Sequence, residues 1–463
     1  MSGKTHPDKT LLERIARFDF IVLFLVLYFC FNTVSIVYVN GDTGPAVFLP
    51  LVILNQQTVF FDQLSPAILQ SPNYDYAFPE VNGHRVSLFP IVTPVLIIPV
   101  YGIQELMAIV LNIPISLDMV AAFAKVSASI IAAASSTLVY LVLKELFSRR
   151  IALITTFVYA FATSTWVVGS QALWQHGMVQ LLLIFLVYCI IRNERKSSVW
   201  WIIAMGSCSG LFIFNRPPDA VLLIPIIVYI VKNCQQHIAP YIGAGILTGF
   251  PFLTYNVLIF GNIFGGYQKN LGFFNFTPDA ITGFVSLLFA PNLGLFIFSP
   301  VLLLAIAGYF KVDTLNRPVI ELILKFFGPV MVLLLAVYSF FGLWSSSTAF
   351  SYGQRFLTGL IPILALYMGF VFRDVFDNTG SISRARVIQV AVILLIFISV
   401  VIQAIGVFLY PMYPEKTMDT SLVWDTDNLL ILNSYEVGMQ TIPVIRMVSF
   451  GPLPPVFTIP IQH

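Results

Sequence analysis

Runs of about twenty apolar residues recur along the whole chain, and they restrict it to a small set of folds. Each run is long enough to cross a bilayer as a helix. Only helices and closed barrels satisfy their backbone hydrogen bonds inside lipid. The chain is 58% hydrophobic and 10% charged, outside the range of soluble domains. The sequence therefore predicts an all-α polytopic membrane protein.

The start of the chain indicates the orientation of the first span. Lys4, Lys9, Arg14 and Arg17 precede an apolar run that is too long for a signal-peptide core and lacks a small-residue cleavage site. We therefore expect an uncleaved first span with a cytoplasmic N-terminus. The four cysteines lie in or beside apolar segments, so a disulfide framework is not expected. A net charge of +2 gives no indication of nucleic-acid binding.

The segment 86–110 decides the topology. It is apolar, but Pro90, Pro94 and Pro99 would break a regular lipid-exposed helix. If it does not span, 17 of the 24 Lys and Arg residues lie on the cytoplasmic side, as the positive-inside rule favours. We therefore predict eleven spans, at 19–40, 118–143, 151–168, 173–191, 199–214, 218–232, 238–260, 290–309, 321–342, 356–372 and 387–409.

This topology gives a membrane-embedded domain over residues 1–410 with a large first outer loop at 41–117. We expect the short apolar segment 45–54 to lie in the membrane interface. Residues 411–463 form an extracytoplasmic tail whose prolines argue against a twelfth span. The chain shows no inverted repeat of the kind found in many transporters.

Charged residues at the outer boundary are the candidates for chemistry. Asp42 follows the first span directly, and ionisable groups at membrane depth often mark functional sites. Arg216, Arg355 and Lys269 stand at outer boundaries, and Lys125 lies in the outer half of the second span. Such cations can bind phosphate, and a carboxylate can remove a proton from a hydroxyl.

Each candidate also has a structural interpretation. Asp42 precedes Thr-Gly-Pro and could cap a helix that begins there. Arg216 could anchor in the interface, and Lys125 could pair with a neighbouring span. His176 could be a hydrogen-bonded structural histidine. The remaining outer carboxylates are expected to be solvated loop charges: Asp62, Asp75, Glu80 and Asp279.

The order of several short motifs resembles one family. They are Asn40-Gly41-Asp42, 87–94 with Pro99, 173–177, 215–217, 255–256 with 260–262, Ser299-Pro300 and 351–357. Across roughly residues 15–410 the chain resembles the C superfamily of integral-membrane glycosyltransferases (GT-C). It is most similar to the prokaryotic branch related to protein O-mannosyltransferases and the lipid-A aminoarabinose transferase.

The resemblance implies a polyprenyl-phosphate-sugar donor and inverting transfer on the extracytoplasmic face. Asp42 stands at the position of the catalytic aspartate, and the proline-broken segment matches the juxtamembrane helices of the first outer loop. Arg216 and Arg355 match basic residues of the family, and we add Lys269 and Lys125 as donor-phosphate ligands. Gln175, His176, Tyr352 and Tyr267 are assigned to substrate binding. Relatives often have an acidic residue or Lys-Pro where this chain has Gln175-His176 and Leu88-Phe89-Pro90, so these secondary contacts differ.

The hypothesis is a hexosyl- or pentosyltransferase of the cell membrane that works on envelope glycans, with Asp42 as general base and no paired acid. The donor would be its only cofactor-like partner, and the acceptor a lipid, glycan or protein in contact with membrane lipids. No metal site is predicted, although a need for a divalent metal stays open. The alternatives are a transporter or flippase of lipid-linked sugars and a non-catalytic assembly protein. The sequence names neither the sugar nor the acceptor.

Overall fold

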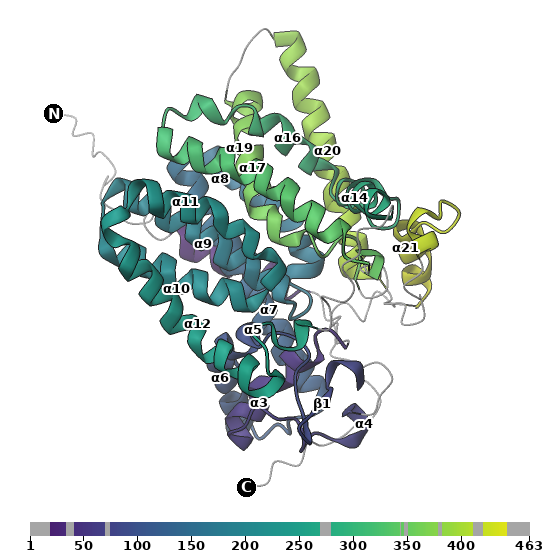
Figure 1. Ribbon diagram of the computed structural model, residues 1–463. Coiled ribbons are helices and arrows are strands. Elements are labelled where there is room, and N and C mark those ends of the chain that lie inside the picture. Colours follow the sequence, from purple (N-terminus) through teal and green to yellow (C-terminus); the bar gives the residue numbers. More distant parts are fainter. Residues whose placement is uncertain are drawn as a thin grey trace, which may run out of the picture.

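The computed structural model describes residues 19–33, 41–69, 75–268, 279–342, 344–346, 351–377, 382–410 and 420–441. These residues are almost entirely helical, as predicted (Figure 1). Their longer helices are α2 (Asp19–Phe31), α3 (Gly44–Gln56), α6 (Ile98–Val110), α7 (Leu117–Leu146), α8 (Arg149–Phe161), α9 (Gln175–Arg195), α10 (Val199–Asn215), α11 (Ile224–Asn233), α12 (Ile238–Phe260), α14 (Asp279–Phe289), α17 (Pro318–Ser339), α19 (Ile361–Phe376), α20 (Ile382–Leu409) and α21 (Leu430–Thr441).

Short helices and one hairpin complete the described chain. The α-helical turns are α4 (Pro66–Leu69), α5 (Val92–Leu96), α15 (Leu295–Phe298) and α16 (Leu303–Tyr309). Tighter or wider turns are η1 (Asp75–Ala77), η2 (Thr165–Gly169), η3 (Pro217–Leu223), η4 (Gln235–His237), η5 (Gly265–Tyr267), η6 (Pro300–Leu302), η7 (Val312–Leu315), η8 (Trp344–Ser346), η9 (Thr358–Leu360) and η10 (Thr420–Trp424). The strands β1 (Glu80–Val81) and β2 (His84–Arg85) pair antiparallel.

Six helical segments of the described chain are long and apolar enough to cross a membrane: 117–146, 175–195, 235–260, 318–339, 358–376 and 386–409. Each of them overlaps a predicted span. The other five predicted spans contain shorter or interrupted helices; 218–232, for example, is divided between η3 and α11. The polytopic character is confirmed, whereas the count of eleven spans stays a prediction.

Glycines allow two of the central helices to approach closely. A Cβ atom at Gly206 of α10 would lie 2.2 Å from the carbonyl oxygen of Tyr241 in α12. One at Gly210 would lie 2.3 Å from the carbonyl oxygen of Gly245. Small residues four apart on both helices are a known means of packing helices in lipid, where apolar burial alone favours no partner.

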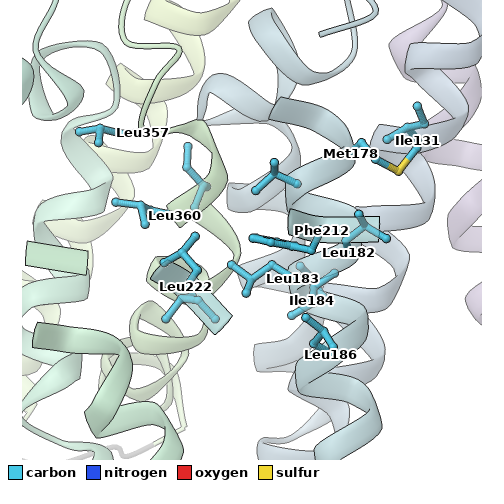
Figure 2. Packing of buried hydrophobic residues seen from close by; sticks show 14 of the residues in the cluster. Ile131, Met178, Leu182, Leu183, Ile184, Leu186, Phe212, Leu222, Leu357 and Leu360 are labelled. Carbon is cyan, nitrogen blue, oxygen red and sulfur yellow. The ribbon is translucent and has the colours of Figure 1, made fainter. Parts of the chain in front are cut away.

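The apolar core surrounds α9, which is buried on most of its surface (Figure 2). Met178, Leu182, Leu183, Ile184 and Leu186 of α9 lie among side chains from α7, α10, η3 and η9. The neighbours labelled there are Ile131, Phe212, Leu222, Leu357 and Leu360. A helix that is apolar all round belongs in an interior. Met178 follows the candidate residues Gln175 and His176 closely in sequence, and Leu357 follows Arg355. Packing of these core side chains therefore holds the backbone of the neighbouring site residues.

The first outer loop folds into a unit at one end of the bundle, drawn in purple at the bottom of Figure 1. The proline-broken run forms α5 and α6, which meet at Ile97, and neither is long enough to span. Asn82 and Gly83 adopt positive φ angles of 54° and 82° in the hairpin turn, as Asn-Gly turns do. The segment 45–54 lies in α3, which is buried from Gly44 to Val52 and packs against α5, α6 and α7. Its expected place in the membrane interface stays a prediction.

Described charges at the other end of the bundle form mostly exposed or half-buried ion pairs. Lys144 contacts Asp19 at 2.8 Å, and Arg195 contacts Glu145 at 2.8 Å. Lys311 pairs with Asp374. All three basic residues belong to the set predicted to be cytoplasmic, and they share one end, as the charge count requires. Which end faces the cytoplasm stays a prediction.

Part of the predicted tail packs onto the bundle. Helix α21 contacts α20, and Asn292 holds the segment before α21. Its side-chain amide donates to the carbonyl oxygens of Leu422 and Asp425 at 2.9 and 2.8 Å and accepts from the backbone of Leu430 at 2.7 Å. The domain division at residue 410 is not tested by these contacts.

Candidate functional site

Asp42 is held by two side chains at the loop end of the bundle. One carboxylate oxygen lies 2.8 Å from Nη2 of Arg355, and the other accepts a 2.6 Å hydrogen bond from the hydroxyl of Tyr76. The cap residue of α3 is Thr43, and it makes no side-chain cap bond. The capping role considered for Asp42 is therefore not what the structure shows. Its side chain is 16% exposed, so solvent reaches it.

Tyr76 was not predicted as a site residue. Partial burial raises the pKa of its hydroxyl above the ordinary value of 10.0, and the adjacent Asp42 carboxylate raises it further. The hydroxyl is therefore a proton donor at neutral pH. No pattern in the sequence marks this tyrosine, because it meets Asp42 only after the first loop has folded.

Arg355 is positioned by a turn and by aromatic rings. Gly353 has a φ of +74°, and a Cβ atom there would lie 2.6 Å from the Phe298 ring, so this turn requires glycine. The guanidinium carbon of Arg355 lies 4.7 Å from the centre of the Trp174 ring and 5.2 Å from that of Phe356. Such stacking is favourable for a desolvated guanidinium.

Arg216 belongs to a second, deeper ion pair. Helix α10 ends before Pro217 and Pro218, which cannot continue its hydrogen bonding, and Arg216 lies at that break. Its Nε lies 3.2 Å from the carboxylate of Asp219 and donates to the Tyr338 hydroxyl at 2.9 Å. That hydroxyl in turn donates to Asp219. Arg216 is 5% exposed and Asp219 is fully buried. Arg216 is therefore an internal charge and not a surface anchor.

The ring of Phe356 connects the two ion pairs. The guanidinium carbon of Arg216 lies 5.7 Å from its centre, on the same ring that Arg355 contacts. Tyr338 stacks on it at 5.4 Å with an interplanar angle of 11°. Asp219 and Tyr338 were missed as site residues. Asp219 could have been found, because it follows Arg216 by three residues beyond two prolines; Tyr338 carries no such signal.

Predicted substrate-binding residues lie beside this cluster. The Tyr267 hydroxyl donates to the side-chain oxygen of Gln175 at 3.1 Å, which brings two of them together. His176 lies between Trp174 and Phe356, with ring centres 6.0 and 6.4 Å away. Tyr352 is separate from these contacts, because its hydroxyl donates to the carbonyl of Ile402 and its ring packs among buried aromatic rings.

Lys125 is buried in α7 and serves as a hydrogen-bond donor to the protein itself. Its ammonium group donates to the carbonyl oxygens of Phe31 at 2.6 Å and Ser170 at 2.8 Å, and to the Ser129 hydroxyl at 3.3 Å. Three acceptors match the three protons of an ammonium group. Lys269, the other predicted phosphate ligand, lies outside the described residues.

The exposed carboxylates of the first loop form their own contacts. Asp62 accepts from His84 at 2.7 Å, and Asp75 lies 3.4 Å from Arg85. Within the described ranges, no three His, Cys, Asp or Glu side chains gather as a metal site requires. The need for a metal stays open.

Part of the chain matches a known family, and its fold resembles that of solved structures. Residues 106–259 match the family described as dolichyl-phosphate-mannose-protein mannosyltransferase. No protein of curated function matches the sequence. The acceptor-peptide-tethered oligosaccharyltransferase of Archaeoglobus fulgidus has a similar fold, with a TM-score of 0.51 and 15% identity over 84% of this chain and 55% of that one.

Two further solved structures are similar to this chain. The archaeal oligosaccharyltransferase AglB, in complex with an inhibitory peptide and dolichol phosphate, matches with a TM-score of 0.50 and 14% identity, over 91% of this chain and 60% of that one. ArnT from Cupriavidus metallidurans, bound to undecaprenyl phosphate, matches with a TM-score of 0.49 and 13% identity, over 84% of this chain and 74% of that one. At these identities the likeness to the oligosaccharyltransferase establishes the fold. This chain spans 55–60% of the length of that oligosaccharyltransferase.

Proposed function

We propose that the chain is a membrane glycosyltransferase of the GT-C superfamily and that it transfers a sugar from a polyprenyl phosphate to an acceptor hydroxyl. The observation that carries the proposal is the meeting of Asp42 with Arg355 at 2.8 Å, beside a second guanidinium at Arg216. A solvent-accessible carboxylate and two fixed guanidinium groups are what a base and a phosphate leaving group need.

The reaction would proceed by one displacement. The acceptor hydroxyl gives its proton to Asp42 while its oxygen attacks the anomeric carbon of the donor sugar. The bond between that carbon and the phosphate oxygen breaks, and the phosphate leaves with the bonding electrons. The new glycosidic bond forms on the opposite face of the sugar, so the configuration inverts. Arg355 and Arg216 would stabilise the additional negative charge on the leaving phosphate.

The surroundings of each predicted residue refine its role. We propose that Lys125 joins α2 to the turn at Ser170 and does not contact the phosphate, because its donors already have protein acceptors. Gln175 and Tyr267 would contact the substrate from the same side. We retain no cofactor besides the donor. The archaeal relative of similar fold is in complex with dolichol phosphate, which supports a lipid phosphate as the donor group.

The active end would be extracytoplasmic. Lys144, Arg195 and Lys311, which are predicted to be cytoplasmic, lie at the opposite end, as the positive-inside rule requires for that orientation. A transporter would need ionisable groups near the middle of the membrane. The described ion pairs gather at the two ends instead, which favours an enzyme over the transporter or flippase.

Replacing Asp42 by Asn tests the proposal. With a polyprenyl-phosphate sugar and membranes that supply the acceptor, we expect transfer to fall by at least about 100-fold, the lower range for losing a general base. Asp62→Asn is the matched control, because Asp62 is an exposed carboxylate of the same loop. An Asp42→Asn variant that transfers sugar at the wild-type rate would refute the base assignment. Mass spectrometry of glycans from a deletion strain identifies the product. Transfer measured with and without EDTA shows whether the reaction needs a divalent metal.

A further inference from the structure

His176 is buried without a hydrogen-bond partner at the edge of the site. It is 3% exposed, and neither ring nitrogen meets a partner among the described residues. Buried polar groups are nearly always hydrogen-bonded, and each exception needs an explanation. An imidazole always offers at least one donor. Leaving both nitrogens unsatisfied is therefore a cost to the unliganded protein that a ligand could remove.

The ring of His176 is held in place by its neighbours. Trp174 meets it edge-on and Phe356 stacks on it. The same two rings support Arg355, and Phe356 also supports Arg216. His176 therefore shares its aromatic supports with both guanidinium groups, and it is fixed close to them without bonding to either.

His176 is also the second residue of α9, a helix of 21 residues. Helix N-termini attract anions, because their first backbone N–H groups lack partners within the helix. The cap residue Trp174 offers no side-chain acceptor, and the first turn of α9 contains no acidic residue. Two independent features, the start of a long helix and a buried unpartnered imidazole, thus coincide.

The charges around His176 explain why an uncharged hydrogen-bond donor would help to bind a phosphate there. Arg216 is paired with Asp219 and Arg355 with Asp42, so each guanidinium charge already has a counter-charge. A phosphate that the two guanidinium groups attract therefore gains from a further donor that is not paired with a carboxylate. An imidazole N–H supplies one, and it does so without adding a charge beside two cations.

We propose that the first turn of α9 is the phosphate subsite of the donor and that His176 donates an N–H to a non-bridging phosphate oxygen. This inference rests on the proposed function, and it names the group that the site recognises: a phosphate attached to a polyprenyl chain. Arg355 lies over the cap residue of the same helix and flanks the subsite. His176 is thus a phosphate contact and not a structural histidine.

The test compares two lipids that differ only in the phosphate. Binding of undecaprenyl phosphate and of undecaprenol to the purified full-length protein in detergent is measured for wild type, His176→Phe and His176→Gln. We expect His176→Phe to bind undecaprenyl phosphate roughly tenfold more weakly, the effect of one hydrogen bond to a charged group. Its affinity for undecaprenol should not change. His176→Gln keeps a side-chain N–H and should recover most of the loss.

Thermal unfolding separates this role from a structural one. His176→Phe removes two unpartnered nitrogens, so its unfolding midpoint should equal or exceed that of wild type. His237→Phe is the matched control, because His237 lies in η4, the turn that joins the end of α11 to the start of α12. This substitution should change the affinity for neither lipid.

Three results would overturn the inference: unchanged affinity for undecaprenyl phosphate in His176→Phe, a parallel loss for both lipids, or a loss that His176→Gln does not recover. Since binding requires no transfer, these results leave the glycosyltransferase proposal standing. Loss of that proposal would be seen instead as a deletion strain with unaltered glycans.

Discussion

The pair of Arg216 and Asp219 gives the sharpest prediction about stability. Asp219→Asn keeps the shape of the side chain and an acceptor for Tyr338 but removes the negative charge. Arg216, 5% exposed, then keeps a buried charge without its counter-ion. The 3.2 Å separation corresponds to about 5 kcal/mol of attraction at an effective dielectric constant of about 20.

That attraction is offset by desolvation in the intact pair, yet breaking such a pair leaves the penalty uncompensated. We therefore expect Asp219→Asn to lose about 3–5 kcal/mol of stability. The matched control is Asp62→Asn. Its partner is His84, and both side chains are about half exposed, at 40% and 48%. An exposed pair contributes at most about 1 kcal/mol. The contrast follows from burial alone, because both variants exchange a carboxylate for an amide.

The four cysteines provide the assay. None of them is in a disulfide, and Cys189, Cys208 and Cys234 are buried. A thiol-reactive dye therefore reports unfolding in detergent as temperature rises. Asp219→Asn should react at a clearly lower temperature than Asp62→Asn. Replacing both partners, Arg216→Met with Asp219→Leu, should recover part of the loss. Equal unfolding midpoints for the two single variants would refute the argument that Arg216 needs its buried counter-charge.

Two further predictions separate support of the site from contact with substrate. Lys125→Met should cost roughly 2–4 kcal/mol of stability, because the buried carbonyl oxygens of Phe31 and Ser170 lose the ammonium group as a hydrogen-bond donor; a higher KM for the donor substrate with an unchanged unfolding midpoint would instead favour phosphate binding. Tyr76→Phe removes one hydrogen bond to Asp42 and should lower kcat about tenfold with little effect on donor affinity. Since the pKa of Tyr76 is raised above 10.0, wild-type activity should not decline through ionisation of this tyrosine between pH 8 and 10. A decline there that is absent from Tyr76→Phe would contradict this.

The sequence predictions that the structure confirmed rest on local features of the chain, namely apolar runs and prolines. Helices could be predicted because a single apolar run of about twenty residues satisfies its own backbone hydrogen bonds in lipid only as a helix. Pro90, Pro94 and Pro99 predicted a broken segment, and α5 and α6 are that segment. The composition of the segment 45–54 did not predict its protein contacts. Only the tertiary structure shows that α3 is covered by α5, α6 and α7.

What the sequence by itself determined is the helical, polytopic character of the chain and the shared end of such described charges as Lys144, Arg195 and Lys311, because both depend on neighbours along the chain. The tertiary structure alone decided the partners. It brought Arg355 to Asp42, added Tyr76 and Asp219, and gave Lys125 three acceptors within the protein. The sequence shows which residues are charged. The partner of a charged side chain depends on which distant segments pack together, as Asp42 and Arg355 do.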